Sequence, residues 1–91
     1  MPMSLAQKAV YKIIDEILWN EWDPLGVNDM EEARDEYQSY TPQVFSLKLN
    51  NRDKETIAQH LLKIEKERMD LPGNIEKCRK VAEKIVTSSL P

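Results

Sequence analysis

The chain has 91 residues, 41% of them hydrophobic and 32% charged, with a formal net charge of −3 at pH 7. This length supplies one hydrophobic core, so we expect a single helical domain over residues 1–91. The acidic balance argues against nucleic-acid binding, and no apolar run approaches the roughly 20 residues of a membrane span. One cysteine excludes an internal disulfide and a multi-cysteine zinc site, and together with the absence of a signal-peptide pattern it favours a cytoplasmic protein.

The first predicted helix begins near Ser4, because Ser4 and Gln7 form a capping-box pattern. Its apolar residues cover more than half of the helical circumference, which is typical of a central helix contacted from two sides. They are Leu5, Ala6, Ala9, Val10, Tyr11, Ile13, Ile14, Ile17, Leu18 and Trp22. The helix should end near Asp23, because Pro24 disfavours the α conformation in the residue before it.

A loop with Gly26 at positive φ is expected over residues 23–29, followed by a second helix capped by Asn28 or Asp29. One side of that helix would carry Met30, Ala33, Tyr37 and Tyr40. The other would carry Glu32, Asp35 and Glu36.

A short third helix is predicted to follow Thr41 and Pro42, which form a good N-cap and N1 pair. Alternation of Phe45, Leu47 and Leu49 also allows a strand over residues 44–49, but a lone strand would have no partner, so helix is favoured. Asp53 should cap a fourth helix that extends to about Met69.

The break at Leu71–Asn74 precedes a last helix from about Ile75 to Thr87. Ile57, Ala58, Leu61, Leu62, Ile64 and Met69 would face inward from the fourth helix, and Ile75, Cys78, Val81, Ala82, Ile85 and Val86 from the last. With only two glycines in the chain, these patterns predict an all-α fold, a compact irregular bundle of about five helices.

Charge is concentrated between Asp15 and Glu36, where nine acids accompany one base, Arg34. From Lys48 onward, bases outnumber acids by ten to seven, so the two halves of the chain should attract each other. Like charges at this density destabilise a compact fold, which indicates either offsetting contacts or a function.

Helical spacing would place the carboxylates of Glu32, Asp35 and Glu36 on one face, an arrangement that hard divalent cations favour. The sequence has no EF-hand spacing and no Glu-x-x-His motif, so this pattern is typical of a solvated acidic face as well. A basic protein partner is the third interpretation of the same face.

The only histidine and the only cysteine have simple structural explanations. His60 lies at the margin of the apolar face of the fourth helix, and no motif gives it an orienting carboxylate or a nucleophile. Cys78 aligns with apolar residues of the last helix, which predicts a buried, inert thiol.

Glu65 and Arg68 both fall within the apolar arc of the fourth helix. Their stems can be buried while the charged heads stay in water, or Arg68 can pair with an acid of residues 15–36. Trp19 points away from the apolar face of the first helix, toward Lys12 and Glu16. Either the following loop folds back over Trp19, or the side chain is an exposed anchor for a partner.

Three segments resemble the YugE-like family of small all-helical bacterial proteins of unknown function. They are EWDPLGV at residues 21–27, DEYQSY at 35–40 and IAQHLLKIEKERM at 57–69, and the similarity extends over about residues 10–86. Related patterns occur in small proteins regarded as candidate toxin immunity proteins. The resemblance implies a helical fold and no established activity; the matching signature positions are Trp22, Asp23, Pro24, Asp35, Tyr37 and Tyr40.

A structural explanation of the signature is that Asp23 accepts hydrogen bonds from backbone N–H groups of the turn, while Trp22 and Tyr37 close the joint between the first two helices. The sequence hypothesis for function is a non-enzymatic protein-interaction module without a cofactor or metal, presenting residues 15–40 to a basic protein partner. An acidic immunity-type inhibitor is one version. Its expected contact residues are Trp19, Trp22, Asp23, Glu32, Asp35, Glu36, Tyr37 and Tyr40. The alternative is a divalent-metal-binding accessory protein or small enzyme that uses Glu32, Asp35 and Glu36.

Overall fold

The computed structural model describes residues 3–88, which form four α-helices, three shorter helical turns and no strand. The α-helices are α1 (Leu5–Ile17), α2 (Thr41–Leu49), α3 (Lys54–Glu67) and α4 (Ile75–Thr87). The turns are η1, a π-helical turn (Leu18–Trp22), and two 3₁₀ turns, η2 (Glu31–Ala33) and η3 (Gln38–Tyr40). The all-α prediction is therefore confirmed, with four α-helices in place of about five.

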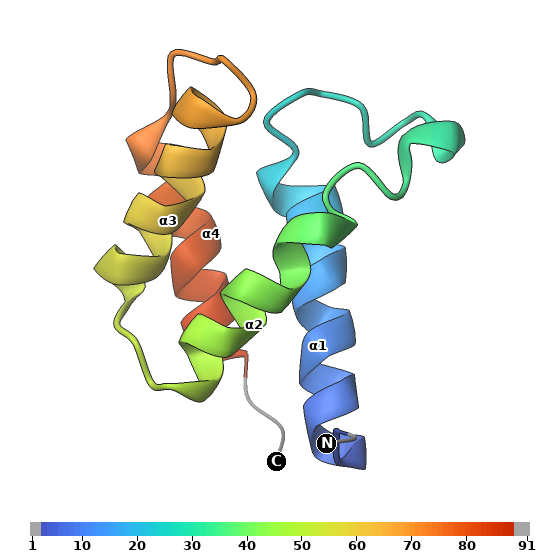
Figure 1. Cartoon of the computed structure of the whole chain (residues 1–91), viewed down its shortest axis with the longest axis vertical. Helices are drawn as coiled ribbons and strands as arrows, with labels where there is room; N and C mark the ends of the chain where they lie inside the picture. Colours follow the sequence, from blue (N-terminus) through green and yellow to red (C-terminus); the bar gives the residue numbers. More distant parts are fainter. Residues whose placement is uncertain (1–2, 89–91) are drawn as a thin grey trace.

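The helix pair α3–α4 and the helix α1 are connected by α2 (Figure 1). α3 and α4 lie antiparallel and side by side, while α2 contacts both α1 and α3, and α1 also contacts α4. The buried core lies between these helices and is completed by the aromatic residues at the end of α1 and in the loop that follows it. Its members are Ile14, Leu18, Trp19, Trp22, Tyr37, Val44, Phe45, Ile57, Ala58, Leu61, Ile64, Cys78, Val81, Ala82 and Ile85.

Side-chain caps determine where three of the helices begin. Ser4 Oγ accepts from the Gln7 backbone N–H at 3.1 Å and Gln7 Oε1 accepts from the Ser4 N–H at 3.0 Å, which is the predicted capping box. Asp53 accepts from the Thr56 N–H at 2.8 Å, and Asn74 accepts from the Lys77 N–H at 3.1 Å. The predicted boundaries of the last two helices are confirmed to within about two residues.

The prediction that the first helix is central is wrong for its N-terminal half. Within α1 only Ile14 is fully buried, and Leu5 remains 86% exposed. α1 does contact two helices, α2 and α4, but its first turn is left largely uncovered.

The predicted second α-helix over residues 28–40 is also wrong. Its backbone hydrogen bonds join residues three apart, such as Arg34 N–H to Glu31 O at 3.1 Å and Glu36 N–H to Ala33 O at 2.9 Å. An α-helix here would place Glu31 beside Asp35 and Glu32 beside Glu36, and like charges at this spacing destabilise a helix.

The segment after Tyr40 is helical, which confirms helix over strand for residues 44–49. The helix begins one residue earlier than predicted, because Thr41 is its first residue and the cap position belongs to Tyr40. The Thr41 hydroxyl donates to Asp15 Oδ1 at 3.3 Å, so it connects α2 to α1. Within residues 3–88, none of the helices has the length and apolar character needed to cross a membrane.

Candidate functional site

Asp23 organises the turn that follows the first helix. The π-helical turn ends with the Asp23 N–H donating to Leu18 O at 3.1 Å, and Asp23 itself takes a positive φ of 30°. Its carboxylate accepts from the backbone N–H groups of Val27 at 2.9 Å and Asn28 at 3.3 Å. Gly26 has the positive φ expected of it, at 66°. The predicted structural role of Asp23 is thus confirmed.

Tyr37 connects this turn to the residues before α2. Its buried hydroxyl donates to Asp23 Oδ1 at 2.6 Å and accepts from the Leu25 N–H at 3.1 Å. Burial, followed by the bond to Asp23, raises the pKa of the phenol above its usual value. The Tyr37 ring lies 5.4 Å from that of Trp22, so these two residues pack together as predicted, although the second helix that they were expected to join to the first does not form.

Trp19 is packed inside the molecule, with 7% of its surface exposed. The loop folds back over it: the Arg34 guanidinium lies 5.2 Å from the centre of the indole ring and also pairs with Asp15 at 2.8 Å. The sequence hypothesis that Trp19 is an exposed anchor is therefore wrong. Trp22 and Tyr37 are likewise buried, and Tyr40 is half-buried against Trp22. These aromatic residues therefore contribute to packing inside the molecule and little to its exposed surface.

Glu65 is the residue whose importance sequence reasoning missed. Its carboxylate is buried, with 3% of the residue exposed, and accepts from Trp22 Nε1 at 2.7 Å, Cys78 Sγ at 3.0 Å and the Asn74 N–H at 2.9 Å. The carboxylate, which belongs to α3, therefore connects η1 to α3 and α4. The position of Glu65 in an apolar arc of the fourth predicted helix was the only sign of this role in the sequence. The sequence could not identify the donors, because they come from other segments of the chain.

Two expectations about nearby residues have opposite outcomes. Arg68 is exposed and pairs with no acid of residues 15–36, so the predicted ion pair is wrong; Lys84 instead pairs with Glu21. Cys78 is buried as predicted, and burial together with the bond to Glu65 raises the pKa of the thiol to about 12. The thiol thus stays protonated at neutral pH, and only the thiolate is a strong nucleophile.

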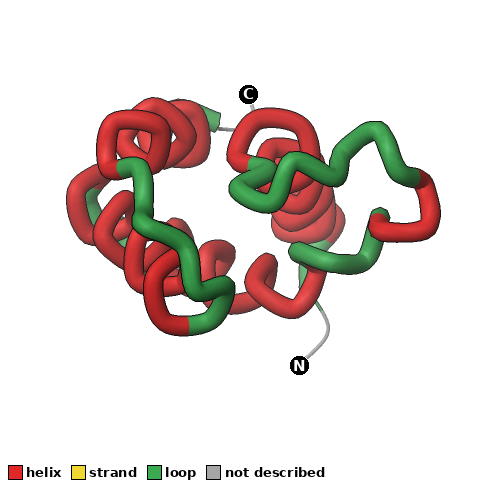
Figure 2. Tube along the Cα trace, turned by 90° about the horizontal axis from the view of Figure 1, so that it is seen from above, coloured by secondary structure: helices red, strands yellow, loops and turns green. Residues whose placement is uncertain are grey.

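Residues 23–40, which we call the acidic loop, extend beyond the four α-helices on one side of the molecule (Figure 2). Five of the loop's acids are exposed, and none of them accepts a side-chain hydrogen bond or forms an ion pair with any residue in the range 3–88. They are Asp29, Glu31, Glu32, Asp35 and Glu36. Leu25 and Met30 of the same loop are also exposed, at 38% and 44%.

Glu32, Asp35 and Glu36 do not form the single helical face that the sequence suggested, because the backbone between them is a series of turns. Across the described residues, no group of three or more histidine, cysteine, aspartate and glutamate side chains is placed to hold a metal ion. The metal-binding alternative therefore loses the geometry on which it depended.

The chain was compared with protein-family models, with curated proteins and with solved structures, and none of the three comparisons finds a match.

Proposed function

We propose that the protein is a non-enzymatic interaction module that presents its acidic loop to a basic partner protein. An inhibitor of the immunity type, which covers a basic surface of its target, is one concrete form of this function. The family resemblance in the WDP and DEY segments is compatible with it and supplies no activity of its own.

The observation that carries the proposal is a contrast among the acids of residues 15–36. Some of them form ion pairs or hydrogen bonds within the protein, and others have no such partner. Asp15 pairs with Arg34, Glu21 pairs with Lys84, and Asp23 holds its turn. The five exposed acids of the acidic loop pair with no base in residues 3–88, although the chain contains 13 lysines and arginines. Their charge is available for a partner, and clustered charge of one sign accelerates encounter with the opposite sign.

The loop also has the apolar contacts and the fixed backbone that a binding surface needs. Leu25 and Met30 offer apolar area beside the charges, and methionine adapts well to partner surfaces. Hydrogen bonds of Asp23 and Tyr37 hold the loop in place, so little conformational entropy is lost on binding. Leu25 and Met30 replace Trp19 as the proposed apolar contacts.

Affinity capture with matched variants tests the proposal. The immobilised protein is compared with a loop variant carrying Glu32→Gln, Asp35→Asn and Glu36→Gln. The control carries Asp70→Asn, Glu76→Gln and Glu83→Gln, three exposed acids outside the loop. Both variants change the net charge by the same amount. We expect a basic protein that the wild type and the control retain and the loop variant loses; equal retention by all three would refute the role of the loop.

A further inference from the structure

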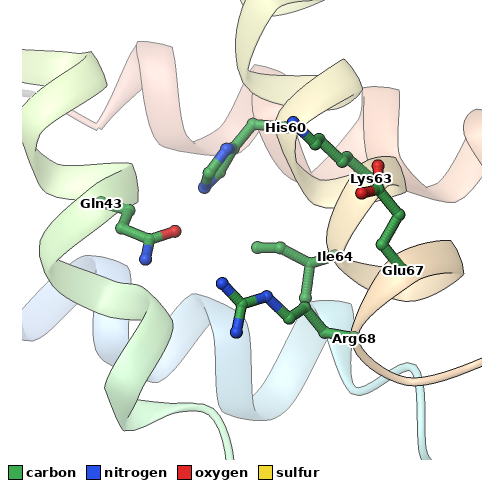
Figure 3. Close-up of a pocket in the computed structure, with 6 residues that line it drawn as sticks. All are labelled: Gln43, His60, Lys63, Ile64, Glu67 and Arg68. Atoms are coloured by element: carbon green, nitrogen blue, oxygen red, sulfur yellow. The ribbon is translucent and has the colours of Figure 1, made fainter.

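A surface hollow of about 290 Å³ lies between α2 and α3, outside the acidic loop. It is lined by Gln43, His60, Lys63, Ile64, Glu67 and Arg68. Gln43 comes from α2, and Arg68 caps the C-terminal end of α3. Figure 3 shows the Gln43 amide, the His60 ring and the Arg68 guanidinium turned toward a common space, with Ile64 between them.

A buried nitrogen of the His60 ring lacks a hydrogen-bond partner. This atom, Nε2, is the one buried side-chain nitrogen or oxygen in residues 3–88 without a hydrogen-bond partner. Leaving such an atom unpaired is unfavourable, and buried polar groups in native proteins are almost always paired. A ligand atom that reaches the hollow would supply the missing partner.

The charge around the hollow favours an anion. Lys63 and Arg68 bring two positive charges and Glu67 brings one negative charge, and neither base forms an ion pair in the part of the chain that the structure describes. Burial, followed by the charge of Lys63, lowers the pKa of His60, so the neutral ring prevails at neutral pH. A neutral imidazole protonated at Nε2 donates one hydrogen bond.

We propose that this hollow, the α2–α3 pocket, binds a small ligand through an oxyanion, either a carboxylate or a phosphate group. The Arg68 guanidinium and the Gln43 amide are donors to the oxyanion, and the arginine fork suits both groups. His60 Nε2 completes the set of donors, Lys63 adds charge, and Ile64 contacts the apolar part of the ligand. Convergent polar groups over an apolar residue are typical of small-molecule sites.

The single histidine of the chain makes a direct test possible, because its ring signals in an NMR spectrum have one source. The protein is titrated at pH 7.5 with inorganic phosphate in one series and acetate in another, with chloride keeping the ionic strength constant. We expect the His60 ring signals to shift and saturate. Saturation with phosphate alone assigns a phosphate ligand, and saturation with acetate alone assigns a carboxylate.

Variants separate a specific site from general charge. Arg68→Gln should weaken the saturating anion at least tenfold, while Arg52→Gln, at an exposed arginine outside the pocket, should leave its affinity unchanged. Circular dichroism checks that both variants stay helical. Shifts that rise linearly with both anions, or equal affinities for wild type and Arg68→Gln, would overturn the proposal.

Discussion

Glu65 shows how a single buried carboxylate holds distant parts of this molecule together. It accepts from Trp22, Asn74 and Cys78, and therefore connects η1 with α3 and α4. No lysine or arginine forms an ion pair with it in residues 3–88, so neutral donors alone stabilise the carboxylate. Removing it leaves the buried indole N–H and the Asn74 N–H without their acceptor.

We predict that Glu65→Ala lowers the free energy of unfolding by at least about 2 kcal/mol, because each unpaired buried donor costs about 1–3 kcal/mol. The measurement is urea denaturation followed by circular dichroism. Glu67→Ala, at an exposed position two residues away, is the control and should change stability by less than about 0.5 kcal/mol. Equal effects of the two substitutions would show that the hydrogen bonds of Glu65 contribute nothing.

The burial of Trp19 predicts how the native protein should fluoresce. Both tryptophans of the chain are buried, so native fluorescence should be blue-shifted and poorly quenched by acrylamide. Denaturant should shift the emission to the red and open it to the quencher. An easily quenched fraction in the native protein that disappears in Trp19→Phe would show that Trp19 is exposed after all.

Among the elements, the best predicted were those whose sequence carries a local signal. Ser4 and Asp53 cap helices as expected, and the last helix has its predicted bounds because Asn74 caps it and the segment before it cannot continue a helix. The helix predicted over residues 28–40 was wrong, because the apolar spacing of this segment suggested a helix while its density of like charges disfavours one. Glu65 and the position of Trp19 depend on contacts between distant segments, which periodicity does not reveal.

The two glycines allow a matched test of the turns. Gly26 and Gly73 both have positive φ, at 66° and 87°, but an added Cβ meets nothing within 4 Å at Gly26 and lies 2.7 Å from Leu62 Cδ1 at Gly73. Each alanine substitution forces a left-handed conformation that costs about 1–2 kcal/mol. We therefore predict that thermal denaturation shows a larger loss for Gly73→Ala than for Gly26→Ala. Equal losses would mean that Leu62 moves aside freely.

In the molecule as a whole, the residues that position the acidic loop differ from those that the loop exposes. The buried aromatic residues, Asp23 and Glu65 fix where the acidic loop lies, while the exposed acids with Leu25 and Met30 form its outer side. The sequence hypothesis and the proposed function concern the same region, since the concentration of acids between Asp15 and Glu36 is visible in the sequence. The expected exposed anchor, Trp19, is instead buried by a loop whose course the sequence does not reveal.

The rate at which the captured partner associates, measured by stopped flow at several salt concentrations, tests the central claim most directly. Steering charges act mainly on association, so the loop variant (Glu32→Gln, Asp35→Asn, Glu36→Gln) should associate more slowly and with a weaker salt dependence than the wild type. Its dissociation rate should change little. The control variant (Asp70→Asn, Glu76→Gln, Glu83→Gln) should behave like the wild type. An unchanged association rate in the loop variant, or an equal decrease in the control, would contradict the assignment of the acidic loop as the binding surface.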